Sequence, residues 1–360
     1  MKKRVIIGLS GGVDSSVAAY KLKQEGYEVI GLFMKNWEEQ TPDGVCSAQK
    51  DYEDVRRVSA ALDIPYYTVN FAKQYYENVF KYFVEEYKAG RTPNPDVLCN
   101  REIKFGYFKD YAMKLGADYI ATGHYCNLIE KDNLTYLAKA KDQNKCQTYF
   151  LNQVTSKQLE NVLFPLGNLY KQEVRKIASD CGLVTAQKKD STGVCFIGER
   201  NFRKFLSNYI PMKEGLIKTL DNKTVGKHEG VFYYTIGQRK GFGMGGKKGE
   251  DNTRPWFIID KDVKNNILYV NQGEHPKLYS KGVVLRKFNF ITKEFEKVVN
   301  KVDFRLRHRQ TLQKGEATIN SDGSLILNFE KEQRAVACGQ YCVIYQGDIC
   351  VGGGVITDKI

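Results

Sequence analysis

No stretch of this 360-residue sequence stays apolar for the roughly 18 residues that a membrane-spanning helix needs. The apolar run Val5–Leu9 is too short for the core of a signal peptide, and Gly11, Gly12 and Asp14 follow it at once. None of the nine cysteines forms a C-x-x-C pair, so we expect no structural zinc site. An odd number of scattered cysteines is typical of buried thiols in a reducing compartment. We therefore expect a cytoplasmic protein that does not enter a membrane.

The composition excludes a disordered chain and a disulfide-stabilised mini-protein. Hydrophobic residues make up 42% of the sequence, enough for sizeable cores, and its length predicts two or three domains. Lysine and arginine number 55 against 42 acidic residues, a net charge of +13. This excess favours a polyanionic partner.

The first half alternates short apolar runs with amphipathic helical patterns, as parallel β-α-β units do. It predicts an α/β doubly wound parallel sheet. The expected strands are Arg4–Leu9, Glu28–Phe33, Tyr66–Asn70 and Asp118–Thr122. The expected helices are Val13–Glu25, Asp51–Leu62, Tyr75–Lys88 and Lys104–Leu115.

In the second half the helical period fades and turn residues become frequent, which favours all-β modules. The Asp322-Gly323 pair between two β-rich runs predicts a hairpin. We expect an α/β domain at residues 1–208, a small β module at 209–279 and a β-barrel at 280–360. Other β-rich runs are Val231–Ile236, Trp256–Ile259, Ile267–Val270 and Ser324–Phe329.

A glycine-rich loop, Ser10–Ser16, directly follows the first strand and opens the first helix. Its glycines let backbone amides approach a phosphate, and the helix N-terminus adds a positive dipole end. It is not a Walker A loop, because no Gly-Lys-Ser/Thr follows. The alternative is an ordinary strand-to-helix turn in which Ser or Asp caps the helix.

The S-G-G-x-D-S pattern of this loop resembles the PP-loop ATP pyrophosphatases. Further motifs resemble one family among them, the tRNA-uridine 2-sulfurtransferases, and span almost the whole chain. These motifs are Thr92–Asn100 with Ile103–Phe105, Ala121–Tyr125, Asp190–Gly198, Tyr234–Gly241 and Gly352–Ile356.

The resemblance implies ATP-dependent 2-thiolation of the wobble uridine in the tRNA anticodon. ATP would adenylate the C2 oxygen, turning a poor leaving group into a good one. Cys195 would carry a persulfide supplied by a cysteine desulfurase or a sulfur-relay protein, Cys99 would attack it and leave a Cys99 to Cys195 disulfide, and Asp96 would act as acid, base or orienting group.

The resemblance also implies two sets of binding residues. ATP, with Mg²⁺, would be bound by Gly8, Leu9, Ser10, Gly11, Gly12, Val13, Asp14, Ser15, Met34 and Gly123. The tRNA would be contacted by Asn94, Pro95, Asp96, His124, Lys145, Cys146, Gln147, Arg307, His308 and Gln340.

Several alternatives stay open at this point. Asp96 could simply cap a helix, and His124 could be a packing or surface histidine. Asp96, Cys99 and Cys195 could instead hold an iron–sulfur cluster. The chain could also be another PP-loop ligase, or a tRNA-binding module with a vestigial loop.

If Val302–Gln310 is a strand, Arg305, Arg307 and Arg309 share one face and could grip phosphates; the alternative is a merely solvated basic face. The chain departs from the family pattern where Cys146 and Thr148 replace the usual Asp and Ser, and where Cys338 replaces a usual Pro. The first change removes a charge from a segment expected to contact tRNA.

Overall fold

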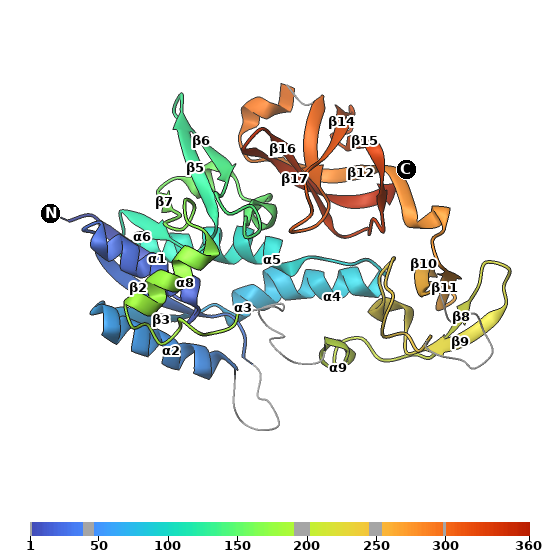
Figure 1. Ribbon diagram of the computed structural model, residues 1–360, viewed down its shortest axis with the longest axis horizontal. Helices are drawn as coiled ribbons and strands as arrows, with labels where there is room; N and C mark the ends of the chain where they lie inside the picture. Colours follow the sequence, from blue (N-terminus) through green and yellow to red (C-terminus); the bar gives the residue numbers. More distant parts are fainter. Residues whose placement is uncertain (1, 39–46, 191–201, 245–253, 298–299) are drawn as a thin grey trace.

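The computed structural model describes residues 2–38, 47–190, 202–244, 254–297 and 300–360. Its N-terminal part is built on a parallel sheet with strand order β3-β2-β1-β4-β7 (Figure 1). The strands are β1 (Arg4–Gly8), β2 (Glu28–Lys35), β3 (Tyr66–Asn70), β4 (Tyr119–Ala121) and β7 (Val162–Leu163).

Side-chain alternation along β1 explains why helices cover both faces of this sheet. Val5 and Ile7 pack with residues of α1 (Val13–Gln24), α2 (Ser47–Leu62) and α8 (Lys171–Asp180). Ile6 belongs to the opposite core, with residues of two long helical segments. The first joins α3 (Ala72–Tyr75), η1 (Tyr76–Phe80) and α4 (Lys81–Lys88), and the second joins α5 (Pro95–Leu98), η2 (Cys99–Phe108) and α6 (Lys109–Lys114).

The second of these helical segments begins earlier than the predicted start at Lys104. Pro95 occupies its first turn, where a missing backbone N–H costs nothing, and the side chain of Asn94 caps it by accepting a hydrogen bond from the backbone N–H of Asp96 at 3.2 Å. The alternative in which Asp96 caps this helix is therefore wrong. Cys99 lies where the segment changes from α- to π-helical geometry.

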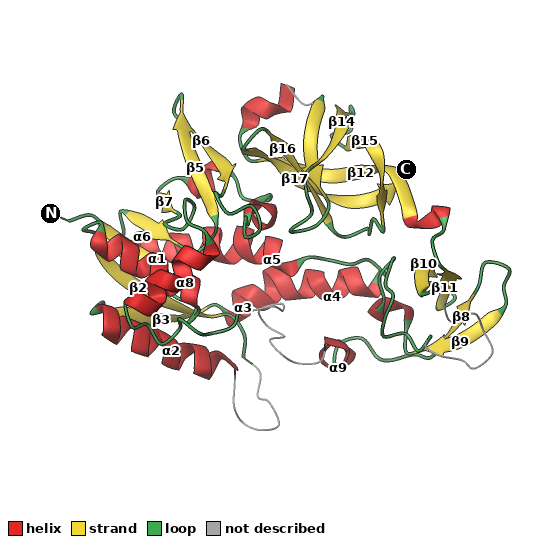
Figure 2. Cartoon of the chain, viewed as in Figure 1, coloured by secondary structure: helices red, strands yellow, loops and turns green. Residues whose placement is uncertain are grey.

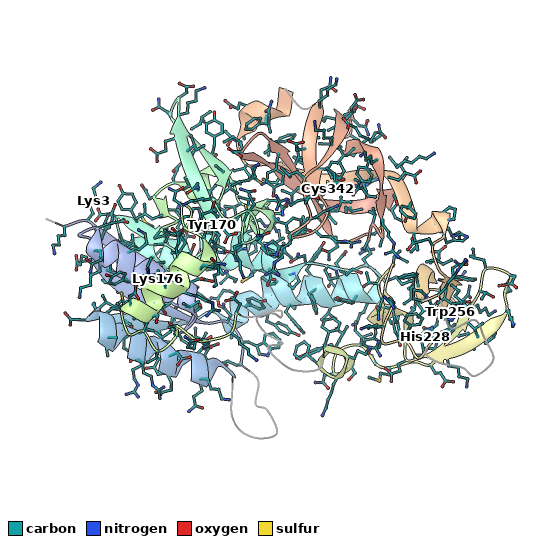
Figure 3. All side chains as sticks on the ribbon, viewed as in Figure 1. Lys3, Tyr170, Lys176, His228, Trp256 and Cys342 are labelled. Carbon is teal, nitrogen blue, oxygen red and sulfur yellow. The ribbon has the colours of Figure 1, made fainter. Side chains whose placement is uncertain are left out.

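The middle of the chain forms a sheet with strand order β10-β11-β8-β9. Its strands are β8 (Gly215–Lys218), β9 (Thr224–His228), β10 (Trp256–Asp262) and β11 (Ile267–Gln272), beyond α9 (Phe202–Ser207), with His228 and Trp256 labelled in Figure 3. The predicted β run Val231–Ile236 is wrong, because Val231–Tyr233 is a 3-10 helix, η4, and none of the six residues lies in a strand. Gly230 precedes it at a φ of 140°, and the Val231 N–H is bonded to the Asn266 side chain, not to a strand.

The C-terminal strands close into the predicted barrel, because β12 pairs with β15 on one side and with β17 on the other. Cys342 lies in its core (Figure 3). The predicted Asp322-Gly323 hairpin joins β14 to β15, with Gly323 at a φ of 77°. The strands are β12 (Tyr279–Phe290), β13 (Lys301–Arg305), β14 (Gln313–Ile319), β15 (Leu325–Arg334), β16 (Tyr341–Gln346) and β17 (Ile349–Lys359).

The predicted face of alternating arginines is wrong. Strand β13 ends at Arg305, which is 3% exposed and has its guanidinium 5.0 Å from the centre of the Tyr345 ring. Arg309 has a φ of 69°, so the chain turns before it. Of the three, Arg307 and Arg309 lie at the surface.

These features confirm an α/β doubly wound domain followed by β modules, a change visible in Figure 2. A hairpin of the first half, β5 (Cys126–Lys131) and β6 (Leu134–Lys139), extends the edge of the barrel sheet at β17. Within the described residues, no helix has the length and apolar character to cross a membrane. The domain boundaries at 208 and 279 stay predictions.

Candidate active site

The Ser10–Ser16 loop is held by its own hydroxyl groups between β1 and α1. The Ser15 hydroxyl donates to the Gly12 carbonyl at 3.1 Å and accepts from the Ser10 backbone N–H at 3.2 Å. Gly12 occupies the N-cap position, and no side chain caps the helix there. An uncapped helix N-terminus presents backbone N–H groups to an anion, so this turn differs from the ordinary Ser- or Asp-capped alternative.

Two glycines are required where the loop meets its neighbours. Gly11 has a φ of 71°, and a Cβ on it would lie 2.5 Å from the Asp51 carbonyl oxygen. A Cβ on Gly123 would lie 2.8 Å from the backbone nitrogen of Ser15. A Cβ on Gly8 would lie 3.2 Å from the Met34 side chain. The structure thus brings the predicted ATP-binding residues Gly8, Met34 and Gly123 together with the loop.

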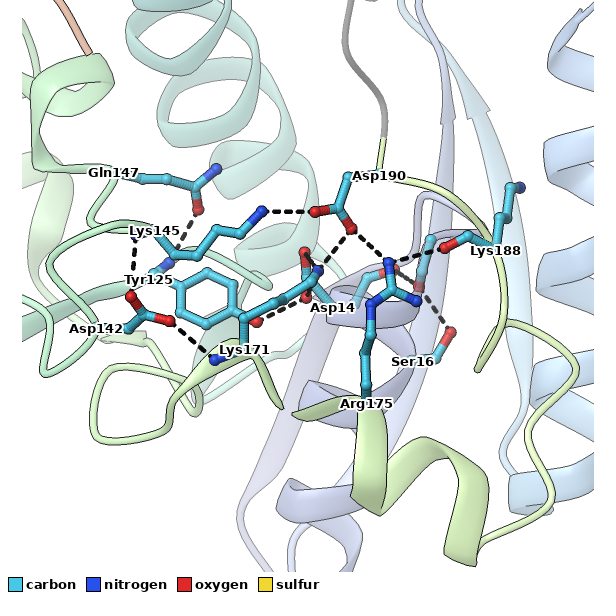
Figure 4. Close-up of polar contacts among 12 residues, drawn as sticks. Asp14, Ser16, Tyr125, Asp142, Lys145, Gln147, Lys171, Arg175, Lys188 and Asp190 are labelled. Atoms are coloured by element: carbon cyan, nitrogen blue, oxygen red, sulfur yellow. Dashed lines mark hydrogen bonds and ion pairs between the residues drawn. The ribbon is translucent and has the colours of Figure 1, made fainter. Parts of the chain in front are cut away.

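A network of charged side chains lies beside this loop (Figure 4). The Lys171 ammonium donates to both carboxylate oxygens of Asp14, at 2.6 and 2.8 Å, and lies 2.9 Å from Asp190. The Tyr125 hydroxyl also donates to Asp14, at 2.8 Å. Burial and the carboxylate of Asp14 raise the pKa of Tyr125, so it stays a donor. Lys171 is 9% exposed and therefore supplies a nearly buried positive charge at the loop.

Cations also fasten residues 186–190 to the loop. Arg175 donates to the carbonyls of Ala186 and Lys188. The Lys188 ammonium donates to the Gly11 carbonyl at 2.9 Å and to Asp51 and Asp54 at 2.8 and 2.6 Å. Burial opposes the charge on Lys188, but the two carboxylates outweigh it and raise its pKa. The end of the described segment at Asp190 is thereby fixed against the phosphate loop.

Cys99 is buried, 4% exposed, at the start of η2, one turn after Asp96. Burial raises the pKa of Asp96, which favours its neutral form, while the Lys104 cation opposes the shift. The Lys104 ammonium lies 3.4 Å from Nε2 of His124, next to Gly123. Lys104 therefore lies between the Asp96 carboxyl, whose pKa it affects, and His124, next to the glycine that packs on the phosphate loop. Cys195 lies outside the described residues.

His124 is packed inside the domain, between the rings of Phe105 and Phe164 at 5.9 and 6.1 Å. Its Nδ1 lies 2.8 Å from the Thr122 hydroxyl. Burial, assisted by Lys104, holds the pKa of His124 well below its usual range, so the ring is neutral. The packing interpretation accounts for these contacts, and a contact with tRNA stays a prediction.

The residues predicted to contact tRNA differ in their exposure. Lys145 and Gln147 are half-buried, whereas Cys146 is fully buried, so a tRNA contact at Cys146 would use its backbone. The His308 ring lies 4.6 Å from that of Phe150. The Gln340 side-chain amide donates to the Thr92 carbonyl at 2.7 Å. The barrel thus contacts the chain just before Asn94 and Asp96.

The sequence comparisons cover the whole chain. A profile described as the tRNA methyl transferase HUP domain matches residues 3–199, and two others, the PRC-barrel domain of tRNA methyl transferase and the aminomethyltransferase beta-barrel domain, match 203–272 and 280–356. The tRNA-specific 2-thiouridylase MnmA 1 of Geobacillus kaustophilus is 54% identical over 100% of this chain and 96% of its own length. The chain belongs to the tRNA-specific 2-thiouridylase family. A second 2-thiouridylase, from Shouchella clausii, is 54% identical over 100% of this chain and 99% of its own.

Likeness to solved structures is weaker. The U34-tRNA thiolase NcsA from Methanococcus maripaludis, solved with its 4Fe-4S cluster, is 18% identical and has a TM-score of 0.36. The match covers 57% of this chain and 65% of the NcsA chain. Within the part of this 2-thiouridylase that the structure describes, no three His, Cys, Asp or Glu side chains are grouped to hold a metal. Since Cys195 lies outside that part, the cluster alternative is not tested.

Sequence reasoning missed the cations of this 2-thiouridylase site. Lys171 and Arg175 lie on α8, a helix that was not predicted, and their i,i+4 spacing puts both on one face. That spacing is a weak signal, because it is common on solvated helices. Only the tertiary fold shows that this face meets Asp14 and Asp190.

Proposed function

We propose that this protein catalyses the ATP-dependent 2-thiolation of the wobble uridine in tRNA anticodons. The observation that carries the proposal is the phosphate loop with Lys171 against Asp14, in a chain whose full-length relatives are named tRNA-specific 2-thiouridylases. Two of the matching profiles are described as domains of a tRNA methyl transferase. A loop of this kind binds nucleotide phosphates, which favours an ATP-dependent reaction.

The loop fits the phosphates of ATP. Its glycines leave room for close approach, and the uncapped N-terminus of α1 supplies donors and a positive dipole end. Lys171 would add a nearly buried charge to the phosphates, and Asp14 is the loop carboxylate that would hold Mg²⁺. The nucleotide supplies AMP to the C2 oxygen of uridine, so that this oxygen can leave as part of AMP.

Sulfur delivery requires both cysteines. Cys195 would carry the outer sulfur of a persulfide, received from a cysteine desulfurase or a sulfur-relay protein in the cytoplasm. Attack of the Cys99 thiolate on the Sγ of Cys195 forms a disulfide and releases sulfide, which displaces AMP from C2. A thiol reductant then returns both cysteines to thiols. Asp96, with its raised pKa, would supply or accept the proton at the uridine.

The tRNA would lie along the barrel and the neighbouring part of the catalytic domain. Arg307 is exposed, and Gln340 joins the barrel to the chain leading to Asp96 and Cys99. Lys145, Gln147 and His308 would contact the same RNA, with Asn94 and Pro95 near the target base. Exposed arginine and lysine charges neutralise phosphates and carry no sequence information.

The proposal is tested by separating adenylation from sulfur transfer. Wild type should release AMP and pyrophosphate with unmodified tRNA, and release neither with fully thiolated tRNA. Cys195→Ala should bind ATP and tRNA but never acquire a persulfide, whereas Cys99→Ala should load sulfur and fail to thiolate. Cys181→Ala, at a half-buried cysteine outside the loop, serves as control and should thiolate normally. Normal thiolation by Cys195→Ala, or activity that follows bound iron, would overturn the persulfide assignment.

A further inference from the structure

One carboxylate, that of Asp190, is shared by three cations, of which Lys145 belongs to the segment 145–147 and Lys171 and Arg175 both lie on α8. Its Oδ2 accepts from the Lys145 ammonium at 2.6 Å. Its Oδ1 lies 2.9 Å from both the Lys171 ammonium and the Arg175 guanidinium (Figure 4). Burial opposes its ionisation, but the hydrogen bonds from Lys145 and Lys171 outweigh it and lower the pKa of Asp190. Asp190 is therefore charged at neutral pH.

The cations paired with Asp190 connect it to different binding regions. Lys171 also binds Asp14 of the phosphate loop, through both carboxylate oxygens. Lys145 belongs to the 145–147 segment assigned to tRNA in the proposed function. Arg175 donates to the carbonyls of Ala186 and Lys188, so it keeps Asp190 in place when either lysine moves away.

We propose that Asp190 is a positioning residue that couples the ATP site to the tRNA-binding segment by holding Lys171 and Lys145 on a single carboxylate. This inference rests on the proposed function, because it needs ATP at the loop and tRNA at Lys145. It assigns Asp190 no contact with either ligand.

The sign of the coupling follows from charge. Both ligands are anions, and each would draw one lysine toward its phosphates and away from Asp190. The carboxylate then holds the remaining lysine more strongly, because fewer cations share its charge. The second anion must then draw its lysine away from a stronger ion pair with Asp190. Each ligand therefore lowers the affinity for the other, by the same factor. Couplings of this kind are typically about 5-fold or larger.

A neighbouring carboxylate provides a matched control. Asp142 also joins the 145–147 segment to α8, but it accepts from backbone N–H groups, those of Asn144 and Lys145 through Oδ1 and that of Lys171 through Oδ2 at 2.9 Å. These bonds fix the backbone and do not compete with phosphates for an ammonium group. Asp142→Asn keeps the oxygen that accepts from the Asn144 and Lys145 N–H groups and loses only the acceptor for the Lys171 backbone N–H.

The experiment measures the dissociation constant of unmodified tRNA with and without saturating α,β-methylene ATP, an analogue that cannot release pyrophosphate. In wild type and Asp142→Asn the analogue should weaken tRNA binding about 5-fold or more. In Asp190→Asn the two constants should agree. Glu at position 190 retains the charge, so Asp190→Glu should retain the coupling. Lys145→Met removes the lysine of the tRNA-binding segment and should also abolish the coupling. The proposal can therefore be tested even if Asp190→Asn does not fold.

The inference is overturned if Asp190→Asn and Lys145→Met bind both ligands with wild-type coupling, if Asp142→Asn loses the coupling as fully, or if wild type binds both ligands with none. A purely structural role for Asp190 would lower the melting temperature and leave the ratio of the two constants unchanged. If wild type binds neither ATP nor tRNA, the proposed function itself fails, which is a different result.

Discussion

Replacing Gly123 by alanine tests the geometry of the phosphate loop directly. The new Cβ would lie 2.8 Å from the Ser15 nitrogen, 2.9 Å from the Asp14 carbonyl carbon and 3.1 Å from the Ser15 Cα, all backbone atoms. Ordinary contact begins at 3.4 Å, so the loop must move by about 0.6 Å. Such overpacking costs about 1 to 3 kcal/mol.

We expect this cost to fall mainly on ATP binding, because the displaced atoms are those that would cradle its phosphates. A loss of about 1 to 3 kcal/mol corresponds to roughly 5- to 150-fold weaker binding. The assay is the dissociation constant for ATP by calorimetry, together with the melting temperature. Gly226→Ala is the control, since its Cβ would meet side-chain atoms and no backbone, the nearest being those of Met244 at 3.3 Å and Ile217 at 3.5 Å. ATP affinity within twofold of wild type in Gly123→Ala would show that the loop can accommodate a Cβ at this position without loss of its phosphate-binding geometry.

Three further predictions concern charge. Asp14→Ala should abolish tRNA-dependent AMP formation while the melting temperature shifts by only a few degrees, because Lys171 keeps Asp190 as a partner; equal loss of fold and activity would defeat the claim. Arg307→Ala should flatten the plot of log tRNA affinity against log salt by about one unit, whereas Arg305→Ala should lower the melting temperature and leave the slope unchanged, because Arg305 packs on Tyr345. Burial lowers the pKa of His308 from 6.5 to about 4, so the fold favours the neutral ring. The stability that the neutral ring contributes is fully present above pH 6.5 and is lost as the pH falls toward about 4. Over that window His308→Gln should therefore lose less stability than wild type, as measured by urea titrations.

The sequence predicted the parallel sheet well because its strands are short, apolar and bounded by turns. Tyr66–Asn70 is a strand with the predicted bounds, and β1 and β2 differ from prediction only at their ends. Failures occurred where a local pattern was overruled by contacts distant in sequence. Val231–Tyr233 is β-rich in composition, but Gly230 and Asn266 turn it into a 3-10 helix.

The candidate site was predicted only where a motif carries its own geometry. Gly11 and Asp14 lie in one turn between a strand and a helix, and Gly123, after β4, packs against the backbone of that turn. Their binding of ATP stays a prediction. Lys171 could not be found from local sequence, since its role depends on the packing of α8 beside α1. The arginine face failed because β13 ends at Arg305, whose side chain is buried, and the chain turns before Arg309.

The reaction proposed for this chain is the exchange of oxygen for sulfur at C2 of a tRNA uridine, driven by ATP. It is tested most directly by incubating the protein with unmodified tRNA, ATP and a cysteine desulfurase with cysteine, then analysing the anticodon nucleosides by mass spectrometry. We expect 2-thiouridine at the wobble position, formed only with ATP and accompanied by AMP. An unmodified wobble uridine when ATP and tRNA are both bound, or a methylated one, would contradict it.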